Sequence, residues 1–186
     1  MHTRPSAIDP YLDAFARIVQ EKGLERTRVQ DVADEVGVNR VTVYRQVGTV
    51  RDMTHLLFER ELQRSLPDVA AWASADDAVG ALVSLLADVV RVFRAHPVLT
   101  KVLEDEPHLL GPYLLRDLPE VLGRSAHVSE GLLTWAMESG RLARRNPAML
   151  GEWVARVLVT AVLSPPAGPL EEFFDEGLRP LLEVPR

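Results

Sequence analysis

The sequence predicts an all-α protein, in which an N-terminal three-helix domain with a helix-turn-helix precedes a larger helical domain. Apolar residues recur along most of the chain at the three- and four-residue spacing of amphipathic helices. Capping residues, glycines and prolines divide that pattern into segments of helical length. No stretch alternates apolar and polar residues in the way that a half-buried strand requires.

Composition restricts the class of protein further. The chain has 186 residues, 47% of them hydrophobic, and no cysteine, so it can bury a large core but offers no disulfide or cysteine metal site. No run of about 18 apolar residues is free of charge and proline, which argues against a membrane span. Residues 1–5 lack an apolar signal region, so we expect a cytoplasmic protein.

Charge is distributed unevenly along the chain. The net charge is −6, yet residues 1–66 carry ten basic and ten acidic side chains, so the acidic excess lies beyond them. Residues 26–51 contain five arginines and three acidic residues, a local excess of +2. A locally basic face on an acidic body would orient the protein on DNA. Ordinary surface scatter explains the same charges equally well, so charge alone does not decide.

The first two helices are predicted from their end signals. A first helix is expected to run to about Lys22, where Gly23 ends it. Thr27 and Gln30 have the spacing of a capping box, which predicts a second helix over residues 28–36.

A third helix is predicted over residues 40–47. Asn39 is its expected N-cap, and Val43 and Val47 form its inner face. The turn 37–39 that separates it from the second helix has the length of a helix-turn-helix turn. Such a unit places its second helix in the major groove of DNA.

Further helices are expected after residue 48. Thr49 and Asp52 form a start signal for the fourth. The segments predicted to be helical are 49–65, 78–95, 98–105, 125–140, 147–163, with Asn146 as cap, and 170–182. Pro107, Pro112 and Pro119 predict an irregular region before residue 125.

Motifs of catalysis and metal binding are absent from the sequence. It contains no HExxH, P-loop, GxSxG or glycine-rich dinucleotide loop. The segment 104–108 gathers three carboxylates and His108, but Pro107 interrupts the helix that would align them, so we expect a solvated acidic turn. The sequence therefore predicts no enzyme, no cofactor and no metal site.

The N-terminal third of the chain resembles the tetracycline-repressor (TetR) family of bacterial transcription regulators. The resemblance covers about residues 8–61, and it is carried by Lys22-Gly23, Val32-Ala33, Gly37-Val38, Val43-Tyr44-Arg45 and Gly48-Thr49. It implies a DNA-binding domain over residues 1–52. It also implies a regulatory domain over residues 53–186 that dimerises and binds a ligand, with the fourth helix as connector. In this family an effector lowers operator affinity by changing the separation of the two DNA-binding domains.

Positions that match the family's motif supply the candidate DNA contacts. The resemblance assigns Arg28 and Tyr44 to the phosphate backbone, and the outward residues of the third helix to base edges or nearby phosphates. Arginine can pair with guanine O6 and N7, and a methyl group can contact thymine. The predicted DNA-binding residues are Thr27, Arg28, Asn39, Arg40, Val41, Thr42, Tyr44, Arg45, Gln46 and Arg51.

Two positions depart from the family's pattern. Val47 replaces a frequent aromatic residue beneath the third helix and keeps that position apolar. Val50 replaces a frequent lysine at the start of the fourth helix, which removes a phosphate contact unless Arg51 supplies it.

The ligand and dimer residues are less clearly marked. Large side chains in the regulatory domain are candidates for pocket walls, although each fits the core or a dimer interface as well: Phe93, Leu103, Tyr113, Trp135 and Met137. The last two helices carry broad apolar surfaces that predict a homodimer, through Trp153, Val157, Leu158, Ala161, Phe173 and Phe174.

The sequence thus predicts a homodimeric repressor that binds double-stranded operator DNA and is released by a small hydrophobic effector. The first alternative is a dimeric DNA-binding protein without an effector, whose helical domain only dimerises or recruits a protein partner. The second is a helical enzyme or carrier that retains the N-terminal domain as a relic and binds no operator.

Overall fold

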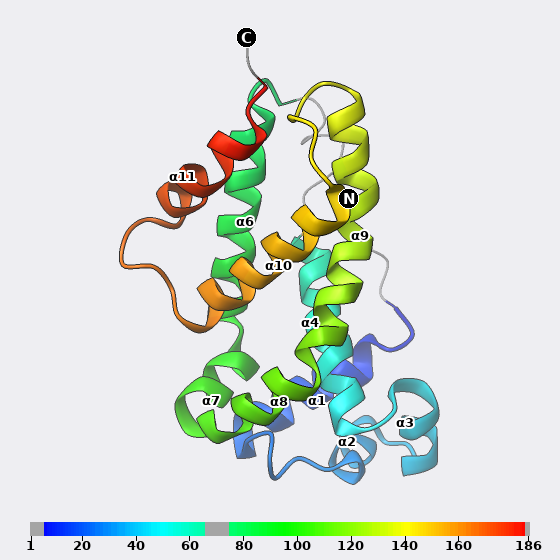
Figure 1. The fold of residues 1–186 in the computed structure, drawn as a ribbon. Coiled ribbons are helices and arrows are strands. Elements are labelled where there is room, and N and C mark those ends of the chain that lie inside the picture. Colours follow the sequence, from blue (N-terminus) through cyan, green and yellow to red (C-terminus); the bar gives the residue numbers. More distant parts are fainter. Residues whose placement is uncertain (1–5, 66–74, 185–186) are drawn as a thin grey trace. The chain divides into compact units, whose positions relative to one another are not determined.

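The computed structural model describes residues 6–65 and 75–184, and every regular element within these ranges is a helix (Figure 1). The helices are α1 (Asp9–Lys22), α2 (Val29–Val36), α3 (Arg40–Val47), α4 (Val50–Ser65), α6 (Ala78–Ala95), α7 (Pro97–Asp105), the 3₁₀ helix η1 (Pro107–Leu109), α8 (Leu110–Arg116), α9 (Leu118–Glu138), α10 (Pro147–Leu163) and α11 (Leu170–Leu182). The predicted all-α fold is confirmed. None of the helices in these ranges is long and apolar enough to cross a membrane.

The chain folds into two compact units. The first consists of Met1–Ser65 and Phe93–Leu110, and the second of Leu66–Val92 and Gly111–Arg186. The segment Phe93–Leu110 thus packs with the N-terminal helices, although it lies far beyond residue 52 in the sequence. A functional boundary between residues 52 and 53 remains a prediction.

The first unit has one apolar core, to which five helices contribute. Phe15 of α1, Val32 of α2, Val43 of α3 and Leu57 of α4 are completely buried in it. Val98 of α7 is also completely buried in the same cluster. Burial of these side chains holds the helix-turn-helix against α1, α4 and α7.

Most of the predicted helix starts in this unit are confirmed. Asn39 caps α3, because its Oδ1 accepts a hydrogen bond from the Thr42 N–H at 2.9 Å. Asp52 accepts a bond from the Thr49 N–H at 2.8 Å, and Thr49 Oγ1 accepts one from the Asp52 N–H at 3.3 Å. These reciprocal bonds form a capping box at the start of α4.

The predicted cap of α2 is wrong. The helix begins at Val29, with Arg28 in the cap position, and the Asp31 carboxylate accepts a hydrogen bond from the Arg28 N–H at 2.6 Å. Thr27 lies one residue too early to cap this helix, and its hydroxyl donates to the Gly23 carbonyl at 2.7 Å. The capping function therefore falls to Asp31 rather than to Thr27 and Gln30.

In the second unit, α9 and α10 pack against each other (Figure 1). Leu86 of α6, Ala136 of α9, Leu150 of α10 and Phe174 of α11 belong to one buried cluster. Asn146 caps α10 as predicted, accepting a hydrogen bond from the Met149 N–H at 3.0 Å.

The predicted start of α9 is wrong. The helix begins at Leu118 rather than near residue 125. Pro119 lies in its first turn, where the missing N–H would have no partner within the helix in any case. A proline at this position starts a helix instead of interrupting one.

Candidate nucleic-acid interface

Gly37 makes the turn between α2 and α3. Its backbone is left-handed, with φ +75°, a conformation that glycine adopts without steric cost. The next residue, Val38, donates its N–H to the Ala33 carbonyl at 2.9 Å and so closes the end of α2. Only three residues, 37–39, therefore separate the end of α2 from the start of α3.

The inner and outer faces of α3 differ sharply. Val43 and Val47 are 0% and 2% exposed and fix the helix to the core. On the outer face Val41 is 70% exposed and Tyr44 47%. The other exposed side chains of this face are Arg40, Arg45 and Gln46. A helix anchored by two valines thus presents cations, an amide and methyl groups together.

Asn39 and Thr42 interact at the start of α3. The Thr42 hydroxyl donates to Asn39 Oδ1 at 3.1 Å, and the Thr42 side chain is half-buried. Because its hydrogen is used in this bond, the hydroxyl can offer an approaching base only an acceptor, beside the γ-methyl group. Both residues keep the position predicted for them at the leading end of the helix.

Two predicted DNA contacts in the loop before α2 differ from each other in exposure. Thr27 is only 1% exposed, so its side chain supports the loop from inside rather than facing the surface. Arg28 is exposed, and its Nη1 donates to the Glu25 carbonyl at 2.6 Å. Arg51, in the first turn of α4, is exposed as predicted.

Carboxylates near this surface are held by partners. Asp31 forms an ion pair with Lys22 at 2.5 Å, and that hydrogen bond, with the one from the Arg28 N–H, lowers the pKa of the Asp31 carboxyl. The backbone N–H and the hydroxyl of Thr49 likewise lower the pKa of Asp52. The ion pair with Lys22 offsets the charge of Asp31. The Asp31 carboxylate also accepts a hydrogen bond at the start of α2, and the Asp52 carboxylate does so at the start of α4.

The residues predicted to line a ligand pocket belong to different units. Phe93 and Leu103 lie in the first, where Phe93 stacks on Phe58 with ring centroids 5.8 Å apart. Tyr113, Trp135 and Met137 lie in the second. Met137 is 6% exposed and is part of the core cluster, whereas Trp135 is 41% exposed. A pocket shared by these residues remains a prediction.

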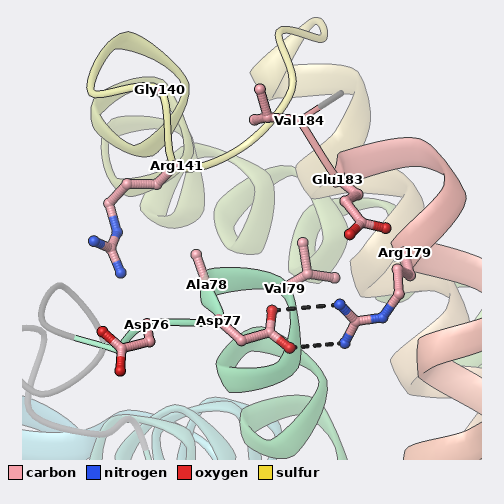
Figure 2. Close-up of a pocket in the computed structure, with 9 residues that line it drawn as sticks. All are labelled: Asp76, Asp77, Ala78, Val79, Gly140, Arg141, Arg179, Glu183 and Val184. Carbon is pink, nitrogen blue, oxygen red and sulfur yellow. Dashed lines mark hydrogen bonds and ion pairs between the residues drawn. The ribbon is translucent and has the colours of Figure 1, made fainter. Parts of the chain in front are cut away.

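A cleft of about 510 Å³ in the second unit has a charged lining (Figure 2). Arg179 bridges Asp77, at 2.9 Å, and Asp175, at 2.7 Å, and these two hydrogen-bonded carboxylates raise the pKa of its guanidinium. Arg141 and Glu183 also line the cleft. None of the predicted pocket residues does, and the charged walls differ from the apolar walls expected for the effector.

The predicted dimer residues divide into core and surface. Ala161 and Phe174 are 3% and 2% exposed and pack in the core of the second unit, which leaves them no surface for a partner. Val157 and Leu158 are half-buried against the same core. Trp153 and Phe173 are 43% and 44% exposed. The surface available for dimer contact is thus narrower than predicted.

The sequence prediction of a solvated acidic turn at residues 104–108 is wrong at Glu106. This side chain is 8% exposed, and its carboxylate accepts hydrogen bonds from the backbone N–H groups of Leu24 and Glu25. The partners are 82 and 81 residues away in sequence, so no local pattern indicates the contact. Asp105 is paired instead with Lys101 of the same helix at 2.5 Å.

The helix-turn-helix matches a known family. Residues 12–47 fit the family model of bacterial regulatory proteins, tetR family, a range that spans α2, α3, the turn between them and most of α1. The match to the TetR family covers these 36 residues of the 186-residue chain.

Solved structures of three repressors share the fold over almost the whole chain. The repressor AlkX from Dietzia sp. strain DQ12-45-1b is 16% identical, covers 96% of both chains and gives a TM-score of 0.73. QsdR from R. erythropolis is 20% identical over 98% of both chains, with a TM-score of 0.63. SmeT of Stenotrophomonas maltophilia is 18% identical over 96% of this chain and 91% of its own, with a TM-score of 0.60. No curated protein sequence matched the chain.

The matched model describes bacterial regulatory proteins, so residues 12–47 resemble a domain of such regulators. The TM-scores show a common fold, but identities of 16–20% do not transfer a ligand or an operator to this chain.

Proposed function

We propose that this protein is a homodimeric transcriptional repressor of the TetR family. It binds a pseudo-palindromic operator through the outer face of α3 and leaves it when a small hydrophobic molecule binds to the helical domain. The observation that carries the proposal is the outer face itself. Arg40, Val41 and Arg45 are exposed on a helix whose opposite side is completely buried.

The chemistry of this face suits the major groove. Arg40 and Arg45 can each donate two hydrogen bonds to guanine, and Gln46 can pair with adenine. Val41 offers methyl groups to thymine. Beside these base contacts, we assign the exposed Tyr44, Arg51 and Arg28 to the phosphate backbone.

An apolar stripe on α11 supports the homodimer. Phe173, Gly177 and Leu181 follow one another at four-residue spacing, and Phe173 and Leu181 are 44% and 41% exposed. A Cβ built on Gly177 would lie 3.9 Å from the ring of Trp153 on α10, so the stripe continues onto that helix. Because adjacent exposed apolar side chains are costly in water, we assign this surface to a second copy.

The effector is assigned by class only. A ligand causes the dimer to release DNA when it prefers the arrangement that does not fit DNA over the arrangement that does. The core of the second unit is formed by aliphatic side chains and Phe174, which suits an apolar ligand. One structural neighbour, AlkX, is a repressor implicated in biodegradation of n-alkanes, so n-alkanes are a reasonable first probe.

Burial of Met137 favours the alternative of an effector-independent DNA-binding protein, because a predicted pocket residue is used as core. Titration of the protein–operator complex with n-decane and longer n-alkanes separates the two. A fall in operator affinity that saturates with alkane concentration supports an effector. Unchanged affinity together with an unchanged melting temperature across the series supports the alternative.

Selection of bound sequences from a pool of random duplexes tests the DNA-binding proposal. We expect enrichment of an inverted repeat whose half-sites lie about one helical turn, or roughly 10 base pairs, apart. A selected pool without a common sequence would contradict operator recognition. A single, unrepeated site would contradict the dimer.

A further inference from the structure

We propose that Glu106 is a positioning residue for operator binding. Its carboxylate holds the loop between α1 and α2, residues 23–28, in the conformation that presents Arg28 and the start of α2 to a DNA phosphate. The inference rests on the proposed function of the helix-turn-helix, and it assigns to Glu106 a part in operator binding that its place in the sequence does not suggest.

Two hydrogen bonds join the carboxylate to the loop. Glu106 lies at the C-terminal end of α7 and is 8% exposed. Its Oε2 accepts from the Leu24 N–H at 2.6 Å, and its Oε1 accepts from the Glu25 N–H at 3.1 Å. Hydrogen bonds to an ionised acceptor are roughly twice as strong as those between neutral groups. Both oxygens of one side chain therefore fix two consecutive peptide groups.

Gly23 makes room for this contact. A Cβ at this position would lie 2.6 Å from Glu106 Oε1, closer than side chains tolerate. The Gly23 backbone also has φ +88°, a conformation that other residues rarely adopt. Both the close approach of the Glu106 carboxylate and the backbone angle therefore favour glycine at position 23.

Contacts inside the loop pass this restraint to Arg28. The Glu25 N–H is held by Glu106, and the Glu25 carbonyl accepts from Arg28 Nη1 at 2.6 Å. The Thr27 hydroxyl donates to the Gly23 carbonyl at 2.7 Å. A loop fixed at Leu24 and Glu25 therefore places the guanidinium of Arg28 directly before α2.

The segment that carries Glu106 is not part of the helix-turn-helix. Phe93–Leu110 belongs to the first compact unit, but it is entered from α6 and left through α8, and both helices extend into the second unit. Burying a carboxylate costs free energy unless it is hydrogen-bonded, and the Leu24 and Glu25 N–H groups supply those bonds to Glu106. The position of α7 along the chain makes the loop conformation dependent on residues outside the DNA-binding helices.

The test compares Glu106→Gln with Glu104→Gln. Both substitutions remove one carboxylate at the end of α7, but Glu104 is exposed and does not lie on the loop. In Glu106→Gln one of the two acceptors becomes an amide donor that faces a backbone N–H. We expect faster hydrogen exchange at the Leu24 and Glu25 amides, and operator binding weakened roughly tenfold because the competent loop is less populated. Glu104→Gln should match the unaltered chain in both measurements.

Glu106→Asp is the second variant, since it keeps two acceptor oxygens on a shorter side chain. Partial recovery of operator affinity in this variant, at an equal melting temperature, supports positioning by the carboxylate. Glu106→Gln that is folded and binds the operator as tightly as the unaltered chain would overturn the proposal. So would faster amide exchange without any loss of affinity. If the unaltered chain selects no DNA sequence, the proposed function itself is wrong. That experiment needs no variant, so it distinguishes this failure from a failure of the Glu106 proposal.

Discussion

Val41 is the residue whose position is hardest to explain by folding alone. It is an apolar, β-branched side chain, 70% exposed, in the first turn of an eight-residue helix. Such a residue adds little to helix stability and loses contact with water only if something covers it. Flanked by Arg40 and near Arg45, it has the composition of a surface that meets base edges and phosphates. Single residues on this face should therefore affect DNA binding rather than the fold.

Replacing Arg40 with alanine should weaken operator binding by about 1–3 kcal/mol and relax sequence preference at one position of each half-site. The reason is the loss of a bidentate contact to a base. Fluorescence anisotropy on the selected operator and on random DNA measures both effects.

Arg17→Ala is the matched control for this substitution. Arg17 is an exposed arginine on α1 that pairs with Glu35 at 3.0 Å, away from the outer face of α3. It should leave sequence preference unchanged. Equal losses on operator and random DNA in Arg40→Ala would argue against base recognition.

The capping carboxylate of α4 predicts a pH dependence of stability. Bonds from Thr49 lower the pKa of Asp52 in the folded state, so ionised Asp52 stabilises the fold at neutral pH. This contribution is fully present above the ordinary carboxyl pKa of about 4 and is lost as pH falls through the lowered pKa. Asp52→Asn should reduce the free energy of unfolding by about 0.5–2 kcal/mol at pH 7.

Urea unfolding across pH 2–7 checks this prediction. The difference between Asp52→Asn and the unaltered chain should shrink as the solution becomes more acidic than about pH 4. Glu59→Gln removes an exposed carboxylate from the same helix and serves as control. A stability difference that is constant over the whole range would show that the ionised cap is not responsible.

At the scale of elements, helices with local end signals could be predicted closely. The starts of α3 and α10 follow from Asn39 and Asn146. Each is an N-cap whose side chain accepts a hydrogen bond from the backbone N–H three residues later. The outward residues of α3 could also be predicted, because the apolar positions of Val43 and Val47 determine which side of the helix is buried.

Features that depend on distant partners could not be predicted. Thr27 has the residue type of a cap, but the Gly23 carbonyl takes its hydroxyl, and Asp31 caps α2 instead. Glu106 reads as part of a polar turn because its partners lie more than 80 residues away. Ala161 and Phe174 read as dimer contacts because periodicity does not tell a protomer's core from its interface.

The stripe on α10 and α11 predicts the effect of a charge at the dimer surface. Trp153→Glu should convert the dimer to a monomer at micromolar concentration, because a carboxylate would be buried without a partner. Leu115→Glu, at a side chain that is 86% exposed on α8, is the control and should remain dimeric.

Sedimentation velocity measures both variants, and circular dichroism shows that they are folded. Dissociation in Leu115→Glu but not in Trp153→Glu would place the dimer surface elsewhere. A chain that is monomeric without any substitution would remove the dimer from the account.

At the scale of the whole molecule, the path of the chain connects the helical domain to the helices proposed to bind DNA. The DNA-binding helices share a unit with Phe93–Leu110, a segment bounded on both sides by helices of the other unit. Movement of those helices on ligand binding can reach the loop before α2 along this segment, because Glu106 contacts that loop. Operator affinity and ligand affinity are then coupled to the same extent in both directions.

The number of protomers bound to one operator tests this account most directly. Sedimentation equilibrium of the unaltered chain with a duplex carrying the selected inverted repeat should give two protomers per duplex. A duplex with one half-site replaced by random sequence should be bound far more weakly. One protomer per inverted repeat, or equal affinity for the intact and half-replaced duplexes, would contradict a dimer that reads two half-sites through α3.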